Sequence, residues 1–221
     1  MNEGLLIVDK PSGITSHDVV SFVRRKFKMK QVGHAGTLDP LATGVLVILL
    51  GKSTKLFNKF SLFDKAYDAT VRLGVRTDTA DIEGKVLMTA DCENVTKEQV
   101  AEVLEKFIGE IEQTPPMFSA VKYKGQKLYN LARKGVSVDR LSRKVRINSL
   151  RLMDFSLPQV TLSMDCSKGT YVRTLAEDVG NILGCGGCIS QIRRTKVGPF
   201  TINDAVKLED INESHIRRWQ N

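Results

Sequence analysis

Hydrophobic residues along this chain form short runs and alternating stretches that predict strands. Residues 4–9 and 45–50 are nearly continuous apolar runs, which are typical of strands buried on both faces. Residues 68–73 have the composition of a further strand, and residues 160–166 alternate between apolar and polar side chains with a period of two. The pattern therefore predicts a central sheet.

Other stretches carry apolar residues at helical intervals. Residues 16–27 predict a helix with Ser16 as its N-cap, with valines on one face and basic residues outside it. Thr96 and Gln99 have the spacing of a capping box, which predicts a helix that continues to Gly109. Further expectations are an extended segment over 118–123, a short basic helix over 127–134 ended by Gly135, and a helix that carries Leu175, Val179, Ile182 and Leu183.

The irregular mixture of strands and helices predicts an α+β fold, with a central mixed or mostly antiparallel sheet flanked by helices. The sequence contains no internal repeat, no low-complexity tract and no Pro/Gly/Ser linker. We therefore expect residues 1–221 to form a single domain.

Charge is unevenly distributed along the chain. The 33 Lys and Arg exceed the 25 Asp and Glu, which gives a net charge of +8. Residues 122–151 hold ten basic residues and one acid, whereas residues 78–113 hold ten acids and three bases. Clustered basic residues are the electrostatic footprint of a polyanion-binding surface, although a merely solvated face has the same composition.

Composition also bears on location. The longest apolar run spans six residues against the roughly 20 needed to cross a bilayer, and the first residues lack a secretion signal. We expect no membrane association and a cytoplasmic protein with reduced cysteines. Cys185 and Cys188 have the spacing of a zinc or redox pair, but no second pair accompanies them, which favours a glycine-rich turn.

The segment richest in turn residues is 33–44, which we expect to be a loop. Its three glycines and one proline stiffen it, and Asp39 precedes Pro40. A residue before proline is driven to extended backbone, so the Asp39 carboxylate can project from a fixed position. The alternative is a turn residue that bonds its own backbone.

Several blocks of the sequence together resemble one family. They are KPSGITS at 10–16, GHAGTLDPLATG at 33–44, LG-x-RTDT-x-D-x-x-G at 73–84, TPP-x-x-SA-x-K at 114–122, SKGTY-x-R at 167–173 and RRT-x-x-GPF at 193–200. In this order they are similar to the blocks of the TruB family of tRNA pseudouridine synthases.

The resemblance implies the pseudouridine synthase fold and a base-flipping isomerisation of the T-loop uridine of tRNA, at position 55, to pseudouridine. It implies no metal, no redox cofactor and no nucleotide cofactor. The expected partner is tRNA, gripped through its T arm by a monomer. Many members carry a PUA domain after the catalytic domain, and we expect none in this chain.

The resemblance also implies the roles of individual residues. Asp39 is the essential carboxylate, Arg173 the cation beside it, and Tyr67 the aromatic residue that stacks on the flipped base. From the sequence alone, Arg173 could instead pair with Glu177 on a helix surface, and Tyr67 could be an ordinary strand aromatic.

Other positions are expected to contact the RNA. His34 matches the loop histidine that replaces the extracted base, while Lys10, Tyr171 and Ile192 match residues that line the site. Alone, these four also fit a turn or a core position. Phosphate contacts are expected from Arg24, Arg25, Lys28 and Lys122.

Two alternatives remain for function. One is an RNA-binding protein without catalysis, and the other is a pseudouridine synthase that acts on another RNA. An Asp39→Asn variant separates catalysis from binding.

Overall fold

The computed structural model describes residues 3–219 and divides the chain into two compact units. Unit 1 comprises residues 1–68 and 192–221, and unit 2 comprises residues 69–191. Two strands, β4 (Lys65–Leu73) and β12 (Gly187–Val197), run from one unit into the other. A single catalytic domain over residues 1–221 stays a prediction.

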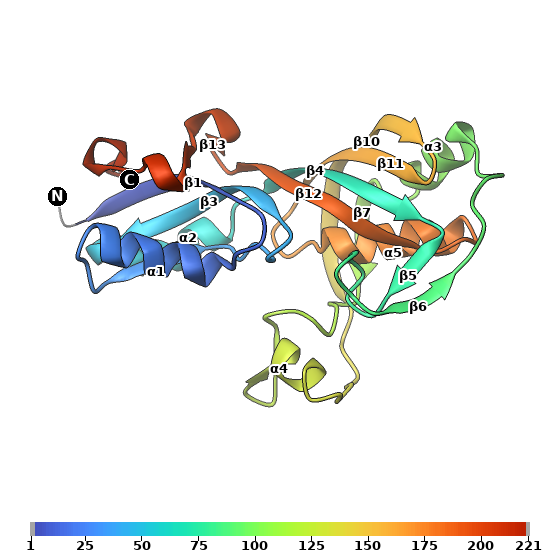
Figure 1. Cartoon of the computed structure of the whole chain (residues 1–221), viewed down its shortest axis with the longest axis horizontal. Coiled ribbons are helices and arrows are strands. Elements are labelled where there is room, and N and C mark those ends of the chain that lie inside the picture. The colour runs from blue at the N-terminus through green and yellow to red at the C-terminus, as the bar shows by residue number, and fades with distance from the viewer. Residues whose placement is uncertain (1–2, 220–221) are drawn as a thin grey trace. The chain divides into compact units, whose positions relative to one another are not determined.

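Unit 1 is a mixed sheet with helices beside it (Figure 1). Its strands lie in the order β14, β1, β3, β12, with β2 also paired to β3 and β13 to β12. β1 runs antiparallel to β3, whereas β12 is parallel to β3 and β14 is parallel to β1. The elements are β1 (Gly4–Lys10), α1 (Ser16–Lys26), β2 (Val32–Ala35), β3 (Thr43–Leu50), η1 (Gly51–Leu56), α2 (Phe57–Ser61), β13 (Phe200–Thr201), η2 (Ile202–Asp204), β14 (Val206–Lys207), η3 (Leu208–Asp210) and η4 (Glu213–His215).

The two apolar runs of the sequence form the centre of unit 1. β1 and β3 are almost entirely buried, as their continuous hydrophobic composition predicts. An aromatic cluster covers one side of them: the Phe60 ring lies 5.0 Å from Trp219 and 6.1 Å from Phe200, between ring centroids. Such pairs stabilise a core beyond the area that they bury.

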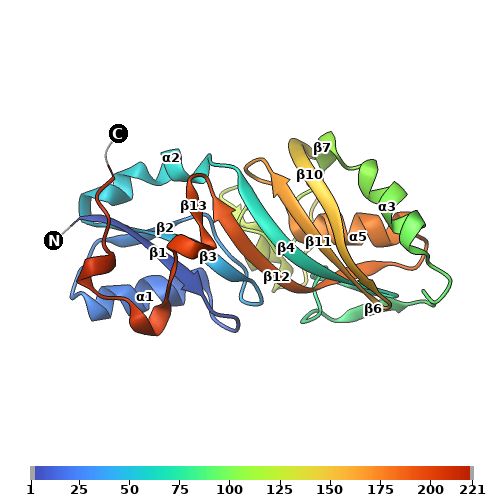
Figure 2. The same cartoon turned by 90° about the horizontal axis from the view of Figure 1, so that it is seen from above.

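Unit 2 is built on antiparallel strands, with the two longer helices α3 and α5 beside them (Figure 2). The strand order is β4, β11, β10, β7, and both pairings of β10 are antiparallel. Together with the sheet of unit 1, this confirms the predicted α+β class with a mixed, mostly antiparallel sheet. The elements are β5 (Val75–Thr77), β6 (Val86–Thr89), α3 (Lys97–Glu105), β7 (Gly109–Gln113), β8 (Lys122–Tyr123), β9 (Gln126–Lys127), α4 (Leu128–Ala132), β10 (Arg143–Ser156), β11 (Gln159–Cys166) and α5 (Val172–Ile182).

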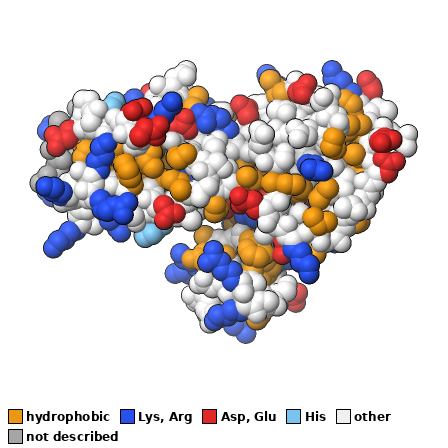
Figure 3. Space-filling view, viewed as in Figure 1, with side chains coloured by type: hydrophobic (Ala, Val, Ile, Leu, Met, Phe, Trp, Pro, Cys, Tyr) orange, Lys and Arg blue, Asp and Glu red, His pale blue; other side chains and the backbone are white. Residues whose placement is uncertain are grey.

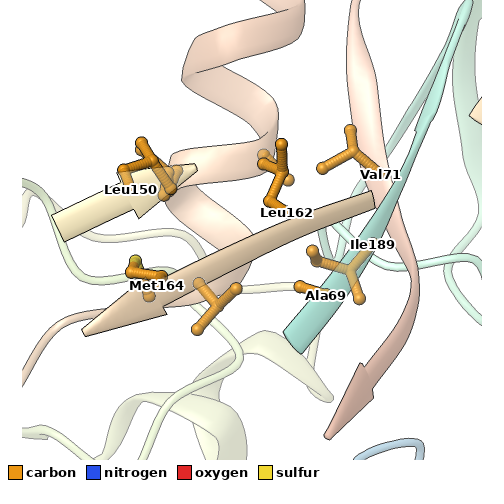
Figure 4. Close-up of a pocket in the computed structure, with 9 residues that line it drawn as sticks. Ala69, Val71, Leu150, Leu162, Met164 and Ile189 are labelled. Atoms are coloured by element: carbon orange, nitrogen blue, oxygen red, sulfur yellow. The ribbon is translucent and has the colours of Figure 1, made fainter. Parts of the chain in front are cut away.

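The core of unit 2 follows from the alternating pattern. Val160, Leu162, Met164 and Cys166 are buried in β11, as predicted, and α5 packs its apolar face against them. Figure 4 shows Leu162 and Met164 among the side chains around a small apolar void. The void measures about 10 Å³, at the lower limit for one water molecule, so it is a packing feature of the core.

Unit 2 contains a long insertion between β7 and β10. It comprises residues 114–142 and protrudes with α4 near its tip (Figure 1). At its hairpin, Lys124 and Gly125 both have positive φ, which is the backbone of a type I′ turn between β8 and β9. Arg140 donates a hydrogen bond to the carbonyl of Pro115 at 3.0 Å, which ties the two ends of the insertion together.

Several predicted boundaries need correction. The N-cap of α1 is Thr15 and not Ser16, because Asp18 completes a capping box with Thr15. Residues 33–35, expected in a loop, belong to β2, since they pair with β3. Residues 118–120 are bends, and only the last two residues of 118–123 form a strand. The capping box at Thr96 is confirmed, but the helix ends at Glu105.

Within residues 3–219, none of the helices has the length and apolar character that a transmembrane segment requires.

Candidate active site

The loop that carries Asp39 lies in unit 1, where β1 and β2 end and β3 begins. Residues 36–42 connect β2 to β3. Lys10, the last residue of β1, pairs with Gly44 at the start of β3, and Arg194 of β12 pairs with Gly44 from the other side. The sheet therefore brings side chains from distant parts of the sequence to the base of this loop.

Hydrogen bonds hold the residues on both sides of Asp39. The Ser16 hydroxyl accepts a bond from the Leu38 amide at 2.8 Å and donates to the Leu38 carbonyl at 2.9 Å. The Pro40 carbonyl accepts from the Gly13 amide at 2.9 Å. Asp39 itself is half-buried, and its carbonyl accepts from the Ala42 amide at 3.1 Å. The carboxylate thus stands on a backbone that hydrogen bonds fix from two sides.

Lys10 is another brace of this loop. It is fully buried, and its ammonium donates to the carbonyls of Pro11 at 2.8 Å, Ile14 at 2.7 Å and Pro40 at 3.2 Å. Burial excludes the alternative of a turn residue that only improves solubility. The ammonium instead ties residues 11–14 to residue 40.

His34, Tyr67 and Ile192 all lie in unit 1, on three different strands. His34 lies half-buried in β2, opposite Ile48 of β3. Tyr67 is 8% exposed on the buried face of β4. Ile192 is half-buried, and its carbonyl accepts from the Thr43 hydroxyl at 3.4 Å, directly after the Asp39 loop. Their contacts with a substrate stay predictions.

The basic face of α1 is only partly available for RNA. Arg25 on α1 and Lys28 just beyond it are exposed, in agreement with the proposed phosphate contacts. Arg24 is half-buried, and it donates to the carbonyl of Val32 at 2.8 Å. Its side chain therefore supports the start of β2.

Arg173 lies in the first turn of α5 in unit 2 and is only 5% exposed. It donates to the carbonyls of Thr79 and Phe118, both at 2.7 Å, and lies 4.0 Å from the Asp81 carboxylate. This burial excludes the alternative of an exposed pair with Glu177. The expected contact of Arg173 with Asp39 stays a prediction.

Tyr171 is fixed through its backbone. The buried side chain of Gln113 accepts from the Tyr171 amide at 3.0 Å and donates to its carbonyl at 3.3 Å. The Arg143 guanidinium lies 4.8 Å above the Tyr171 ring, within cation–π range. The half-buried ring of Tyr171 is thus held between α5 and β10.

The basic residues of segment 122–151 divide into exposed and structural ones. Figure 3 shows Lys and Arg side chains gathered on the protruding insertion. Lys122 is exposed in β8. Arg140 and Arg143 bond backbone carbonyls, and Lys144 pairs with Glu110 at 2.8 Å. The other exposed basic residues of the segment are Lys124, Lys127, Arg133, Lys134, Arg146 and Arg151.

Comparison with known proteins decides the family. Residues 24–172 match the model of the TruB family pseudouridylate synthase N-terminal domain, and residues 173–221 match that of the tRNA pseudouridylate synthase B C-terminal domain. The chain belongs to the TruB family. The predicted class, an isomerase, is confirmed at the level of this family.

Curated TruB relatives match almost the whole chain. A tRNA pseudouridine synthase B of Clostridium tetani is 48% identical over 98% of this chain and 75% of its own length. Another of Geotalea uraniireducens is 50% identical over 94% of this chain and 67% of its own length.

Solved structures confirm the predicted pseudouridine synthase fold. A chain in the crystal structure of a Cbf5-Nop10-Gar1 complex is 30% identical with a TM-score of 0.74, over 95% of this chain and 53% of that one. A chain in the structure of an H/ACA RNP bound to a substrate RNA containing 2′-deoxyuridine is 26% identical with a TM-score of 0.70, over 94% and 51%. The present chain spans about half the length of these solved chains.

Reading the sequence did not identify some residues that support this TruB site. Arg194 and Gln113 are 1% exposed, and Asp81 is 8% exposed. Each is a polar residue in a buried position. Asp81 and Arg194 lie inside two of the sequence blocks that resemble the family, and Gln113 directly precedes a third, so these blocks are the signal that points to them.

Cys185 and Cys188 lie at a glycine-rich turn, as expected. Cys185 and Cys188 are buried, and Gly184 and Gly186 have positive φ where α5 leads into β12. Burial raises the pKa of the Cys188 thiol, which favours its unreactive form. Within residues 3–219, no group of three or more His, Cys, Asp or Glu has a metal-binding arrangement.

Proposed function

We propose that this chain isomerises the T-loop uridine of tRNA, at position 55, to pseudouridine. The observation that carries the proposal is Asp39, held half-buried on a braced loop in a member of the TruB family. The relatives from Clostridium tetani and Geotalea uraniireducens bear the name tRNA pseudouridine synthase B, which supports tRNA as the substrate.

The reaction rearranges bonds within one nucleotide. The bond from N1 of uracil to C1′ of ribose breaks, the ring turns, and C5 bonds to C1′. C5 loses its proton and N1 gains one, so nothing is consumed. Asp39 acts on the sugar in this scheme, either by attack on C1′ or by removal of the C2′ proton. Both roles require the ionised carboxylate.

Other residues are proposed to support that step. Arg173 is proposed to supply positive charge for Asp39, as the resemblance to the family implies, and its guanidinium is a planar fork that suits a carboxylate. Tyr67 stacks on the flipped base. His34 fills the space that the base leaves, which offsets part of the few kcal/mol that unstacking costs. Tyr171 and Ile192 are proposed to lie against the flipped base, and Lys10 holds the loop beside it in place.

Phosphate contacts are proposed to come from exposed cations in both units. Arg25 and Lys28 lie at the end of α1, and Lys122 lies on the protruding insertion. These contacts are independent of sequence and sensitive to salt. Binding energy gained there is available to extrude the base.

The test maps pseudouridine in unmodified tRNA incubated with the purified protein. We expect pseudouridine at position 55 with the parent protein and none with Asp39→Asn, while the tRNA dissociation constant stays within about threefold. Asp154→Asn removes an exposed carboxylate of β10 and is the matched control, with parental activity expected.

Three results would contradict the proposal. Parental turnover by Asp39→Asn would remove that residue from the chemistry. A parent that binds tRNA and forms no pseudouridine in any RNA would be a binding protein. Pseudouridine formed only in ribosomal or messenger RNA would assign a different substrate.

A further inference from the structure

Arg194 is among the largest side chains that are completely buried in the protein. It lies in β12, and only 1% of it is exposed. Its guanidinium donates three hydrogen bonds, all to backbone carbonyls: Nε to Val45 at 2.8 Å, Nη2 to Gly36 at 3.0 Å and Nη1 to Thr37 at 3.4 Å. The side chain therefore contacts the backbone at two separate places.

These two places lie on opposite sides of the Asp39 loop. Gly36 and Thr37 are its first residues, and Val45 lies in β3 shortly after its end. A guanidinium is planar and presents its donors in a fixed fork, so it fixes the distance and the angle between the two groups that it bonds. A lysine ammonium at this position could not reproduce that geometry.

Gly44 allows the backbone of Arg194 to come close enough. The two residues pair in the parallel register of β12 and β3, and a Cβ on Gly44 would lie 2.2 Å from the Arg194 carbonyl oxygen. Gly44 also has φ of +100°, which other residues rarely adopt. The glycine at position 44 thus allows the backbone of Arg194 to approach β3 this closely.

Burying a cation in a protein core carries a large desolvation cost. Among residues 3–219, none of the observed salt bridges includes Arg194, so carbonyl dipoles are the groups that solvate its charge. An apolar side chain of similar volume would avoid that cost of desolvation. The three directed hydrogen bonds account for an arginine here, and two of them end on the Asp39 loop.

We propose that Arg194 is a positioning residue for the isomerisation. It holds Gly36 and Thr37 against β3 and thereby sets where Asp39 stands when the uridine is bound. This inference rests on the proposed function. Because Arg194 acts on the position of the carboxylate, its loss lowers kcat and leaves the affinity for tRNA unchanged.

The experiment compares Arg194→Lys and Arg194→Met with a matched control. Lys65 is also a buried cation of unit 1 that bonds carbonyls, those of Ser61 and Phe63, away from the Asp39 loop. Lys65→Met therefore measures the general cost of removing such a group. For each variant, single-turnover pseudouridine formation, tRNA affinity, thermal unfolding and amide hydrogen exchange of residues 36–42 are measured.

Arg194→Lys is expected to fold and to lose about 100-fold in kcat, because a displacement near 1 Å at the reacting group has an effect of this size. Its dissociation constant for tRNA stays within about threefold, and exchange of residues 36–42 accelerates. Lys65→Met loses stability but keeps its kcat and the slow exchange of this loop.

The outcomes separate the two proposals. A parent without pseudouridine formation refutes the proposed function. An active parent with an equally active Arg194→Lys, or with a loss no larger than that of Lys65→Met, refutes only the positioning role. If Arg194→Lys fails to fold where Lys65→Met folds, Arg194 serves the fold as a whole and the inference is wrong.

Discussion

Replacing Ser16 with alanine tests whether the backbone next to Asp39 is held by a single hydroxyl group. Ser16 is 2% exposed, and its hydroxyl bonds both the amide and the carbonyl of Leu38, at 2.8 and 2.9 Å. Leu38 is itself buried, so water cannot easily replace the lost partner. The substitution therefore leaves two backbone groups unsatisfied while changing almost no volume.

The magnitude follows from these two bonds. A net contribution of about 0.5 to 1.5 kcal/mol each predicts that Ser16→Ala lowers the free energy of unfolding by about 1 to 3 kcal/mol. In a chain of this size, each kcal/mol lowers the melting temperature by about 2 to 4 °C, so a decrease of about 2 to 12 °C is expected. The freed loop is also expected to lower kcat by at least about tenfold.

The chain offers a direct assay for this change. Trp219 is the only tryptophan in the sequence, and it packs on Phe60 in unit 1, the unit that contains Ser16. Its fluorescence during urea and thermal unfolding reports on this unit. Ser21→Ala, on the same helix and without a side-chain hydrogen bond among the described residues, is the control. Equal stability and equal kcat for the two variants would refute the reasoning.

Two further predictions concern backbone strain and burial of charge. Gly44→Ala should prevent folding, because the added Cβ would lie 2.2 Å from the backbone of β12. Gly13 also has positive φ, but the space around it is open, so Gly13→Ala should lower the free energy of unfolding by only about 1 to 2 kcal/mol. The yield of folded protein and its melting temperature distinguish the two variants. Burial raises the pKa of Asp178 to about 6, so the folded state loses stability as the pH rises from about 4 through 6. Asp178→Asn should therefore melt at a higher temperature than the parent at pH 8 and at the same temperature near pH 4, as measured by circular dichroism. An equal difference in melting temperature at both pH values would show that the raised pKa of Asp178 is not the cause.

Local pattern was sufficient for most of the secondary structure. The buried strands β1 and β3 are continuous apolar runs, and β11 alternates with a period of two. The capping box at Thr96 depends on residues three positions apart, so it could be read directly.

The errors occur where distant segments decide the structure. β2 forms because it pairs with β3, and its own four residues, Val-Gly-His-Ala, do not predict a strand. Ser16 resembles an N-cap, but its hydroxyl is already bonded to Leu38, 22 residues later, and Thr15 makes the cap. Local propensity cannot reveal a partner that only the fold brings near.

The sequence blocks identified which residues belong to the candidate site. The structure adds the hydrogen bonds that hold these residues in place. Asp39, Lys10 and Arg173 were all expected near the chemistry. That Lys10 and Arg173 would be buried and bonded to backbone carbonyls was not, because charged residues are normally assigned to the surface.

Buried cations at the base of the Asp39 loop also determine the electrostatics of unit 1. Lys10 and Arg194 each bring a full positive charge beneath residues 36–42, and the carbonyls that accept their hydrogen bonds contribute only partial charges. The field of two such charges is weakly screened where water is excluded. The two charges therefore favour an anionic group next to residues 36–42, such as a phosphate of the nucleotide in the proposed complex. The same side chains that fix the backbone thus prepare the charge environment that the proposed reaction needs.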